Sequence, residues 1–570
     1  MQATILTLGA TLAAASPYKY HTTHPPLAET RNGTYKGVYS PDYNQDFFLG
    51  VPYAQAPVDD LRFRNPKPLA SSWNGNRRAD TYSPACVGYG PSQAGYNVSE
   101  DCLYLNIIKP SGIDAGVDLP VAVWIHGGGW IQGSGVDLRY NMSYIVQQSQ
   151  QQGQPIVAVT LNYRLSAWGF LQGYANAGNG SSLDAGSNWG LRDQRLGLHW
   201  IQENIRAFGG DPSKVTIWGQ SAGAASVGVH LTAFSGRDDS LFRSAIMESG
   251  NPIIVGASDR SFEATFHNLT EAAGCGNATD ALQCLRDLSY SSLKTVINTT
   301  LFSGAWSPQI DGDFIATYSS DQVTKGSFVR VPIVVGANSD EGTSFAPKGL
   351  NTTEQFLKTL ICTSPMNSSI AQRILDTYPL QSSENDLANL GPSGFVPPAY
   401  PYGLQYRRAT TYYTDQTFVA NRRLTCQTWA AYSLTAYCYR FNAIPSWAGS
   451  YDGATHFVEV AFAMKNVEGV GYAPVRTPPF QGLSQSYKDL ATLMAGDWIS
   501  FIAGGDPNSW DRRRVLDSLQ AEVPTWTTYA NKTPQIFVYE GNATNVMEDD
   551  TSRAEGTDLI NSLNKEVYGR

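Results

Sequence analysis

The segment around Ser221 combines a nucleophile with glycines on both sides. Residues Gly219–Gly223 read Gly-Gln-Ser-Ala-Gly, which has the form G-x-S-x-G. The run Val215–Trp218 before it is apolar or β-prone, and the small residues of 224–231 after it are typical of a helix. Glycines allow a strand and a helix to come this close, and the turn between them exposes the serine hydroxyl for attack. The alternative is a tight turn that merely contains a serine.

A serine hydroxyl is a weak nucleophile at neutral pH, so it needs a base, and the base needs an acid to orient it. In a strand–turn–helix arrangement of this kind, the chain order is serine, acid, histidine. Three histidines follow Ser221, namely His230, His267 and His456. His230 lies on the helix that leaves the turn and points away from the serine. His267 leaves little room for an acid on a later strand. His456 follows a late strand and is therefore the predicted base.

The acid is expected at the carboxyl end of a strand between the serine and the base. The apolar run 331–335 leads into Asp340 and Glu341, and both carboxylates fit by position. Asp311 and Asp313 fit less well, because they lie in a predicted turn. Spacing alone does not separate Asp340 from Glu341.

A glycine-rich segment, His126-Gly-Gly-Gly-Trp130, follows the apolar run 120–125. Consecutive glycines let backbone N–H groups point at one oxygen without interference from a Cβ atom, as an oxyanion hole requires. The N–H of Ala222, next to the serine, would be a further donor. A flexible glycine turn is the alternative. We interpret His126 itself as structural.

These groups need a rigid frame, and the hydrophobic pattern indicates one. Several continuous apolar runs are typical of strands buried on both faces. Helical spacing of apolar residues predicts helices over 192–208 and 487–502, and strands that alternate with helices predict a mostly parallel sheet with helices on both faces. The stretch 350–435 is predicted to be a helical insertion, and 380–405 an irregular surface segment. The predicted strands are 120–125, 155–161, 215–218, 244–247, 331–335, 436–441 and 535–539, with an antiparallel edge over 30–55.

Composition restricts the class of protein. The chain has 570 residues, 42% hydrophobic and 16% charged, so it can bury a large core. Its length alone suggests two or more domains. The net charge is −9 and no basic stripe is present, which argues against nucleic acid as a partner. No run of 18 or more apolar residues is present, so we expect no membrane span.

Three features favour export from the cell. Residues 1–15 are small and apolar and resemble a signal peptide cut near Ala15, although they contain no Lys or Arg. Seven cysteines suggest an oxidising compartment. Cys86 and Cys102 are close in sequence, as are Cys275 and Cys284, and each pair could close a short loop; the odd number then predicts one free thiol among Cys362, Cys426 and Cys438, whose pairing stays open. Eleven N-x-S/T sequons fit a protein with N-linked glycans, at Asn32, Asn97, Asn141, Asn179, Asn268, Asn277, Asn298, Asn351, Asn367, Asn531 and Asn542.

Taken in order, these motifs resemble the type-B carboxylesterase/lipase family, which includes cholinesterases and secreted fungal esterases and lipases. The likeness extends from about residue 30 to 540 and is greatest to the secreted fungal carboxylesterases. The segments that carry it are Glu100–Asn106, His126–Gly129, Phe208–Pro212, Gly219–Gly223 and Asp340–Gly342.

The resemblance implies an α/β-hydrolase fold as one large domain over residues 16–570, in place of the two domains that length suggests. It implies a triad of Ser221, Glu341 and His456, which selects the glutamate. It assigns the oxyanion donors to Gly128, Gly129 and Ala222, two disulfides to Cys86–Cys102 and Cys275–Cys284, and the support of the acid to Ser249. The candidate walls of an acyl pocket are Phe302, Trp306 and Phe345, which are core residues in the alternative interpretation.

Departures from the family pattern narrow the predicted activity. Cholinesterases hold choline with a tryptophan before the second cysteine, but residues 87–101 contain none, and Gln220 replaces a glutamate of those enzymes. The same short stretch is too polar for the long lid of the fungal lipases. We therefore expect an esterase for soluble or small esters that works through an acyl-enzyme without metal or cofactor. A lipase for triacylglycerols or sterol esters is the first alternative, and a non-catalytic adhesion-type member the second.

Overall fold

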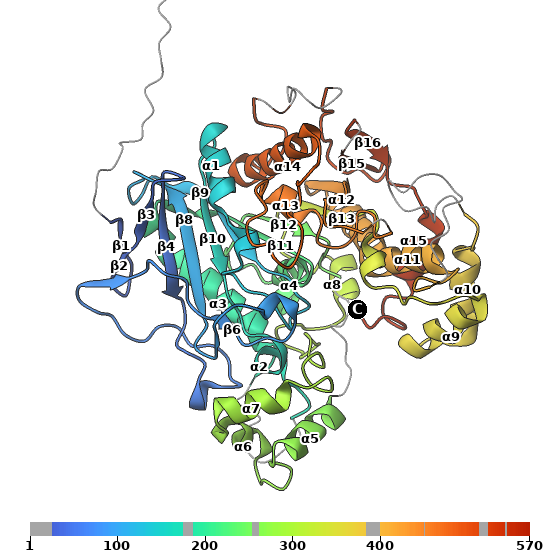
Figure 1. Cartoon of the computed structure of the whole chain (residues 1–570), viewed down its shortest axis with the longest axis horizontal. Helices are drawn as coiled ribbons and strands as arrows, with labels where there is room; N and C mark the ends of the chain where they lie inside the picture. The colour runs from blue at the N-terminus through green and yellow to red at the C-terminus, as the bar shows by residue number, and fades with distance from the viewer. Residues whose placement is uncertain are drawn as a thin grey trace, which may run out of the picture.

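The computed structural model describes residues 25–174, 186–253, 262–382, 400–449, 451–511, 513, 522–541 and 544–570. The predicted signal peptide and residues 383–399 of the predicted surface segment lie outside these ranges. The main feature of the described part is an 11-stranded sheet (Figure 1). In spatial order its strands are β16 (Val546–Asp549), β15 (Gln535–Glu540), β14 (Ala436–Asn442), β13 (Ile333–Asn338), β12 (Ser244–Glu248), β11 (Gly210–Gln220), β9 (Leu119–Ile125), β10 (Val157–Leu161), β8 (Tyr104–Pro110), β4 (Gln45–Pro52) and β3 (Val38–Ser40).

The strands from β15 to β10 are parallel to one another, and the pairs at both ends of the sheet are antiparallel. Strand β9 explains why the apolar runs are continuous. Its residues Val121, Val123 and Ile125 belong to one core cluster, whereas Ala122 and Trp124 belong to another. Because successive side chains of a strand point to opposite faces, both faces of this sheet are buried.

Helices cover the two faces. Helices α3 (Trp189–Asn204) and α4 (Ala222–Gly236) pack on one face, and α1 (Ser143–Gln151) and α14 (Gln485–Gly504) pack on the other (Figure 1). The predicted mostly parallel sheet with helices on both faces is therefore confirmed. Within the described ranges, no helix is both long and apolar enough to cross a membrane.

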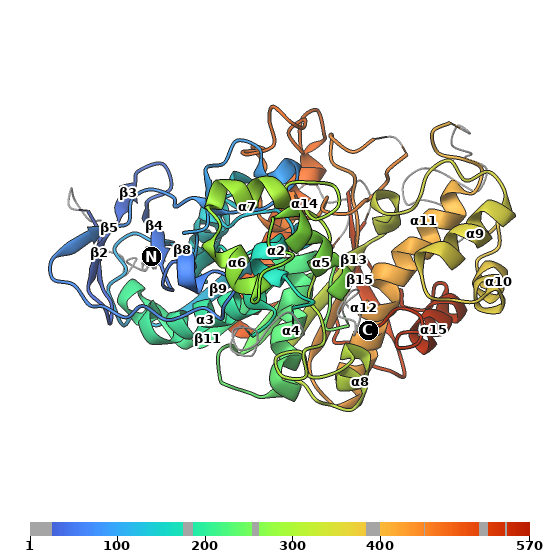
Figure 2. The ribbon, with the colours of Figure 1, turned by 90° about the horizontal axis from the view of Figure 1, so that it is seen from below.

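Further helices belong to the described parts of 350–435. Helices α9 (Thr353–Thr363), α10 (Ser368–Thr377) and α11 (Tyr406–Thr414) group at one end of the molecule with α15 (Ala554–Ser562) around a separate apolar cluster (Figure 2). The π-helix η7 (Asp415–Val419) and α12 (Ala420–Ala431) follow α11, and α12 packs on β13 and β14, with Trp429 in the main core cluster. A second group comprises α5 (Glu263–Ala272), α6 (Ala281–Asp287) and α7 (Tyr290–Ile297) (Figure 1).

Six of the seven cysteines are paired, and the seventh, Cys362, is exposed and free. Both expected disulfides are present, and so is the single free thiol. The pairing that the sequence left open joins helix α12 to strand β14. The three disulfides are Cys86–Cys102, Cys275–Cys284 and Cys426–Cys438.

Candidate active site

The predicted strand–turn–helix is present at Ser221. Strand β11 ends at Gln220 and helix α4 begins at Ala222, with Ser221 between them at φ 57° and ψ −128°. A positive φ is uncommon for a residue other than glycine. The flanking glycines have a steric reason, because a Cβ on Gly219 would lie 2.6 Å from backbone of Gly223, and one on Gly223 would lie 2.0 Å from a carbonyl oxygen of β9.

The side chains of Ser221, His456 and Glu341 form a continuous line of hydrogen bonds. The Nε2 of His456 lies 2.7 Å from the Oγ of Ser221, and its Nδ1 lies 2.5 Å from the Oε2 of Glu341. Glu341 is fully buried at the start of the 3-10 helix η5 (Glu341–Ser344), directly after β13. Its other oxygen accepts the backbone N–H of Asn338 at 2.8 Å. The line joins groups that follow three parallel strands at their carboxyl ends, β11, β13 and β14.

The other candidates for the acid and the base do not take part in this line of hydrogen bonds. The carboxylate of Asp340 accepts the N–H of Ala454 at 2.7 Å, so it ties down the loop that carries His456. His230 is buried on α4 and bonded to Gln194, and His267 is exposed on α5. None of these three residues belongs to the line from Ser221 to Glu341.

The surroundings of His456 favour its protonated form, which a catalytic base adopts once it has accepted a proton. Burial by itself lowers the pKa of His456, but the negative charge and the hydrogen bond of Glu341 outweigh it and raise the pKa above the ordinary value. With Glu341 as an acceptor, the neutral ring carries its proton on Nδ1. Its Nε2 is then free to accept the hydroxyl proton of Ser221.

A second buried carboxyl, Glu459, lies behind this line and has no counterpart in the sequence prediction. Its Oε2 accepts the side-chain N–H of Asn338 at 2.5 Å, and its Oε1 accepts the hydroxyl of Ser249 at 3.2 Å. Burial raises the pKa of Glu459 to about 7, and the charge of Glu341 adds to this effect. Ser249 was expected to support Glu341, but its hydroxyl donates to the second carboxyl, Glu459, which Asn338 connects to Glu341 through its side-chain and backbone N–H groups.

The glycine-rich loop lies against the serine. A Cβ on Gly127 would be 3.0 Å from the Cβ of Ser221. Gly128 and Gly129 have φ of 105° and 66°, which side chains strain to adopt. Ala222 is the first residue of α4, and the first N–H groups of a helix have no intrahelical partner. The three predicted oxyanion donors thus stand on the two segments that adjoin the serine oxygen.

A cavity of about 140 Å³ opens beside Ser221. Its walls include Trp130, Phe345 and Phe418. The two phenylalanines also hold the ring of His456, with ring centroids 5.0 and 5.1 Å away. Phe345 is 45% exposed, as befits a residue at the mouth of a cavity.

Two predicted pocket residues are core residues instead. Phe302 and Trp306 are 3% and 1% exposed, belong to the main core cluster and are not among the described walls of this cavity. Trp130 and Phe418 were not predicted as walls. Trp130 could have been found, because it follows the oxyanion glycines directly. Phe418 lies on η7 in the helical insertion, and nothing in the neighbouring sequence marks it as a wall of the cavity.

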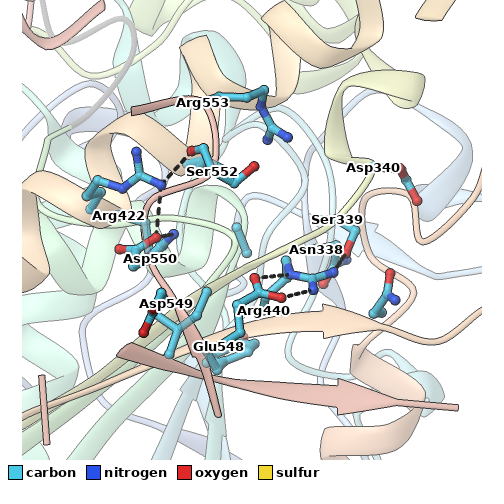
Figure 3. A pocket seen from close by; sticks show the side chains of 16 residues that line it. Asn338, Ser339, Asp340, Arg422, Arg440, Glu548, Asp549, Asp550, Ser552 and Arg553 are labelled. Carbon is cyan, nitrogen blue, oxygen red and sulfur yellow. Dashed lines mark hydrogen bonds and ion pairs between the residues drawn. The ribbon is translucent and has the colours of Figure 1, made fainter. Parts of the chain in front are cut away.

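A larger cavity of about 390 Å³ lies between α12 and the ends of β13 to β16 (Figure 3). Its arginines are paired with carboxylates, for example Arg422 with Asp550 at 2.6 Å and Arg440 with Glu548 at 2.6 Å. Burial opposes the ionisation of Asp550, but the nearby arginines outweigh burial and hold its pKa well below the usual range. Ser221 is not among its walls, so we interpret this cluster as structural.

Comparison with known proteins identifies the family to which the chain belongs. The model of the carboxylesterase family matches residues 24–555. Lipase 1 of Geotrichum candidum is 33% identical over 430 residues, which cover 66% of this chain and 73% of that protein. Secreted lipase 1 of Botryotinia fuckeliana is 32% identical over 535 residues, 86% of this chain and 85% of that protein. The crystal structure of Aspergillus niger EstA superposes with a TM-score of 0.79 at 27% identity, over 95% of this chain and 98% of that one.

The layered sheet, the serine turn and the similarity to EstA define an α/β-hydrolase, as predicted. The chain belongs to the carboxylesterase family, and it is a carboxylic ester hydrolase whose substrates are small-molecule esters.

Proposed function

We propose that the chain is a secreted serine carboxylesterase with Ser221, His456 and Glu341 as its catalytic triad. The observation that carries the proposal is the line of hydrogen bonds at 2.7 and 2.5 Å through the two nitrogens of His456. Such a line gives a serine the base and the oriented imidazole that it needs.

In the first half of the proposed reaction, the Oγ of Ser221 attacks the ester carbonyl while the Nε2 of His456 takes its proton. The carbonyl oxygen becomes an oxyanion and accepts hydrogen bonds from the N–H groups of Gly128, Gly129 and Ala222. Each donor of this kind is worth about 3 kcal/mol in the transition state. Glu341 stabilises the imidazolium.

In the second half, the tetrahedral intermediate collapses and His456 gives its proton to the departing alcohol. The acyl group remains on Ser221 as an ester. A water molecule then loses a proton to His456, attacks the acyl carbonyl and passes through a second oxyanion. The acid leaves, and the proton returns from His456 to Ser221.

The size of the cavity supports small acyl groups. A cavity of 150 Å³ in another protein holds benzene, so the cavity of about 140 Å³ beside Ser221 fits an acyl chain of about six carbons. The short stretch 87–101 contains, as regular elements, the three-residue 3-10 helix Pro91–Gln93 and the two-residue strand β7 (Val98–Ser99), and no long flap. Both observations favour an esterase over a lipase.

Lipase activity is the second candidate, since both relatives compared above by sequence are named lipases. A chain-length series of nitrophenyl esters below and above micelle formation separates the two. Preference for long chains with a jump in rate at the interface would favour the lipase.

Secretion and glycosylation are part of the proposal. Among the described residues, every sequon asparagine is exposed or half-buried, and three disulfides are present. One similar protein is a secreted lipase. Enzymatic removal of N-glycans from the secreted protein should lower its mass, and an unchanged mass would contradict the glycan assignment.

The triad is tested with Ser221→Ala. Hydrolysis of nitrophenyl esters should fall by at least about 1,000-fold, as removal of such a nucleophile does in other enzymes. The matched control is Ser368→Ala, a serine exposed on α10, which should keep full activity. Full hydrolysis by Ser221→Ala would overturn the proposal and favour another nucleophile. A wild-type protein without hydrolysis would favour the adhesion-type alternative.

A further inference from the structure

The oxyanion loop ends in a bulky residue with a strained backbone. Trp130 follows Gly128 and Gly129 directly and has φ of 60°. A tryptophan in this left-handed region is a genuine outlier, and such strain persists only where the surroundings fix it. The side chain of Trp130 is 7% exposed and forms a wall of the cavity beside Ser221. The contacts of this side chain therefore fix the loop together with its backbone, where the carbonyl of Trp130 accepts the N–H of Ser166 at 2.7 Å.

The polar contact of the Trp130 side chain is with Ser226. The indole N–H donates to the Oγ of Ser226 at 3.0 Å. Ser226 is fully buried on α4, where its hydroxyl donates to the carbonyl of Ala222 at 2.8 Å and accepts from the side chain of Gln194 at 3.2 Å. A hydroxyl has one proton to donate and two lone pairs to accept with. The hydroxyl of Ser226 therefore makes all the hydrogen bonds that it can, and in each of them the donor and the acceptor are fixed.

The far end of the network holds Gln194 in this orientation. Its Oε1 faces the Nε2 of His230 at 3.0 Å. Burial lowers the pKa of His230 well below its ordinary value, and the charge of Arg195 lowers it further. The imidazole is therefore neutral, and with the Oε1 of Gln194 as its partner, Nε2 carries the proton. Gln194 is left with its N–H₂ group directed at Ser226.

We propose that Ser226 is a positioning residue for the oxyanion hole, an inference that rests on the proposed function. It bonds on one side to Trp130, which follows Gly129, and on the other to the carbonyl of Ala222. It thus connects the loop that carries two oxyanion donors to the helix that carries the third. Because these donors act on charge that develops in the transition state, a loosened loop lowers kcat more than it raises KM.

The test uses two conservative variants and their combination. Trp130→Phe removes the indole N–H but keeps an aromatic wall, and Ser226→Ala removes the hydroxyl. The control is Trp429→Phe, because Trp429 is also buried and donates its N–H to the carbonyl of Val331, between α12 and the sheet. The readouts are kcat and KM for nitrophenyl acetate, the inhibition constant of an aryl trifluoromethyl ketone, which forms an oxyanion adduct on serine, and the Tm.

We expect each single variant to lose about 10-fold in kcat, the scale of one lost hydrogen bond, with KM within about two-fold. The trifluoromethyl ketone should bind more weakly by the same factor. The double variant should lose little more than either single variant, because both remove the same bond. Trp429→Phe should lower Tm but keep kcat.

Three results would overturn the inference about Ser226. One is a kcat within about two-fold of wild type in both variants, and a second is an equal loss in Trp429→Phe. Losses that multiply in the double variant would also overturn it, since they would assign independent roles to the two residues. Failure of the proposed function is a separate outcome, because it appears as full activity of Ser221→Ala whatever the Ser226 variants do.

Discussion

The Nε2 of His456 lies 2.7 Å from the Oγ of Ser221, although 235 positions of the chain separate the two residues. Glu341 lies on the other side of the same ring, 115 positions before it. The parallel sheet brings them together, because the loops that follow β11, β13 and β14 all leave its carboxyl edge. This geometry is the basis of the predictions below.

The pH dependence of hydrolysis should follow His456. Its pKa is raised by Glu341 against the effect of burial, so the ring stays protonated to a higher pH than a free histidine. A protonated ring cannot accept the proton of Ser221, so kcat/KM should rise with pH and reach half its plateau above 6.5, the ordinary value of histidine. A pH profile of kcat/KM checks this, and a midpoint at or below 6.5 would contradict it.

Glu459→Gln should shift that profile to lower pH. The negative charge of Glu459 contributes to the raised pKa of His456, so its removal makes the protonated ring less stable. The amide can still accept from Asn338 and donate to Ser249, which keeps the packing. The control is Glu555→Gln, exposed on α15. An unmoved midpoint for Glu459→Gln would show that Glu459 does not influence the base.

Phe345→Ala should change the acyl-chain preference. The wild-type enzyme should hydrolyse esters of up to about six acyl carbons best, given its cavity of about 140 Å³. Removal of this wall should extend the optimum to longer chains. A series of nitrophenyl esters measures this, with Leu301→Ala as the control, because Leu301 is 59% exposed and is not a described wall of the cavity. The same optimum in both variants would exclude Phe345 as a wall.

Asp550→Asn should destabilise the protein by about 3–5 kcal/mol, because it leaves Arg422 and Arg423 buried without their carboxylate. The control is Asp313→Asn, whose pair with Arg192 is exposed and worth at most about 1 kcal/mol. Thermal unfolding and kcat of the folded enzyme are the measurements. Equal Tm losses in the two variants would contradict the prediction, and kcat should not change.

Because its pKa is lowered, the stability that Asp550 contributes through its ion pairs with Arg422 and Arg423 should depend on pH. Its folded pKa is held below that of the unfolded chain, about 3.9, by the two arginines. The stabilisation is therefore fully present above about pH 4 and is lost as the pH falls towards the folded pKa. The Tm difference between wild type and Asp550→Asn should shrink in acid. A difference that is constant with pH would contradict this sign.

Local patterns predicted much of the frame and the site. The apolar runs located the parallel strands, because burial on both faces leaves no polar positions in a strand such as β9. The glycines around Ser221 and at 127–129 were informative for a steric reason that acts over a few residues. The order of serine, acid and histidine then reduced the choice of base to His456.

What the sequence could not predict depends on how loops turn. Asp340 and Glu341 are adjacent, and only the start of η5 turns one towards His456 and the other towards Ala454. Phe302 and Phe418 are both aromatic residues in helical or irregular segments. Which of them reaches the cavity depends on packing between segments over a hundred positions apart.

Active-site labelling tests most directly whether Ser221 is the nucleophile. Wild type and Ser221→Ala would be treated with an organophosphonate probe, followed by intact mass, peptide mapping and ester hydrolysis on the same samples. We predict one adduct, on the peptide that contains Ser221, with loss of hydrolysis in proportion to labelling, and no adduct on Ser221→Ala. An adduct on Ser221→Ala, or a wild-type enzyme that hydrolyses esters without being labelled, would contradict the account.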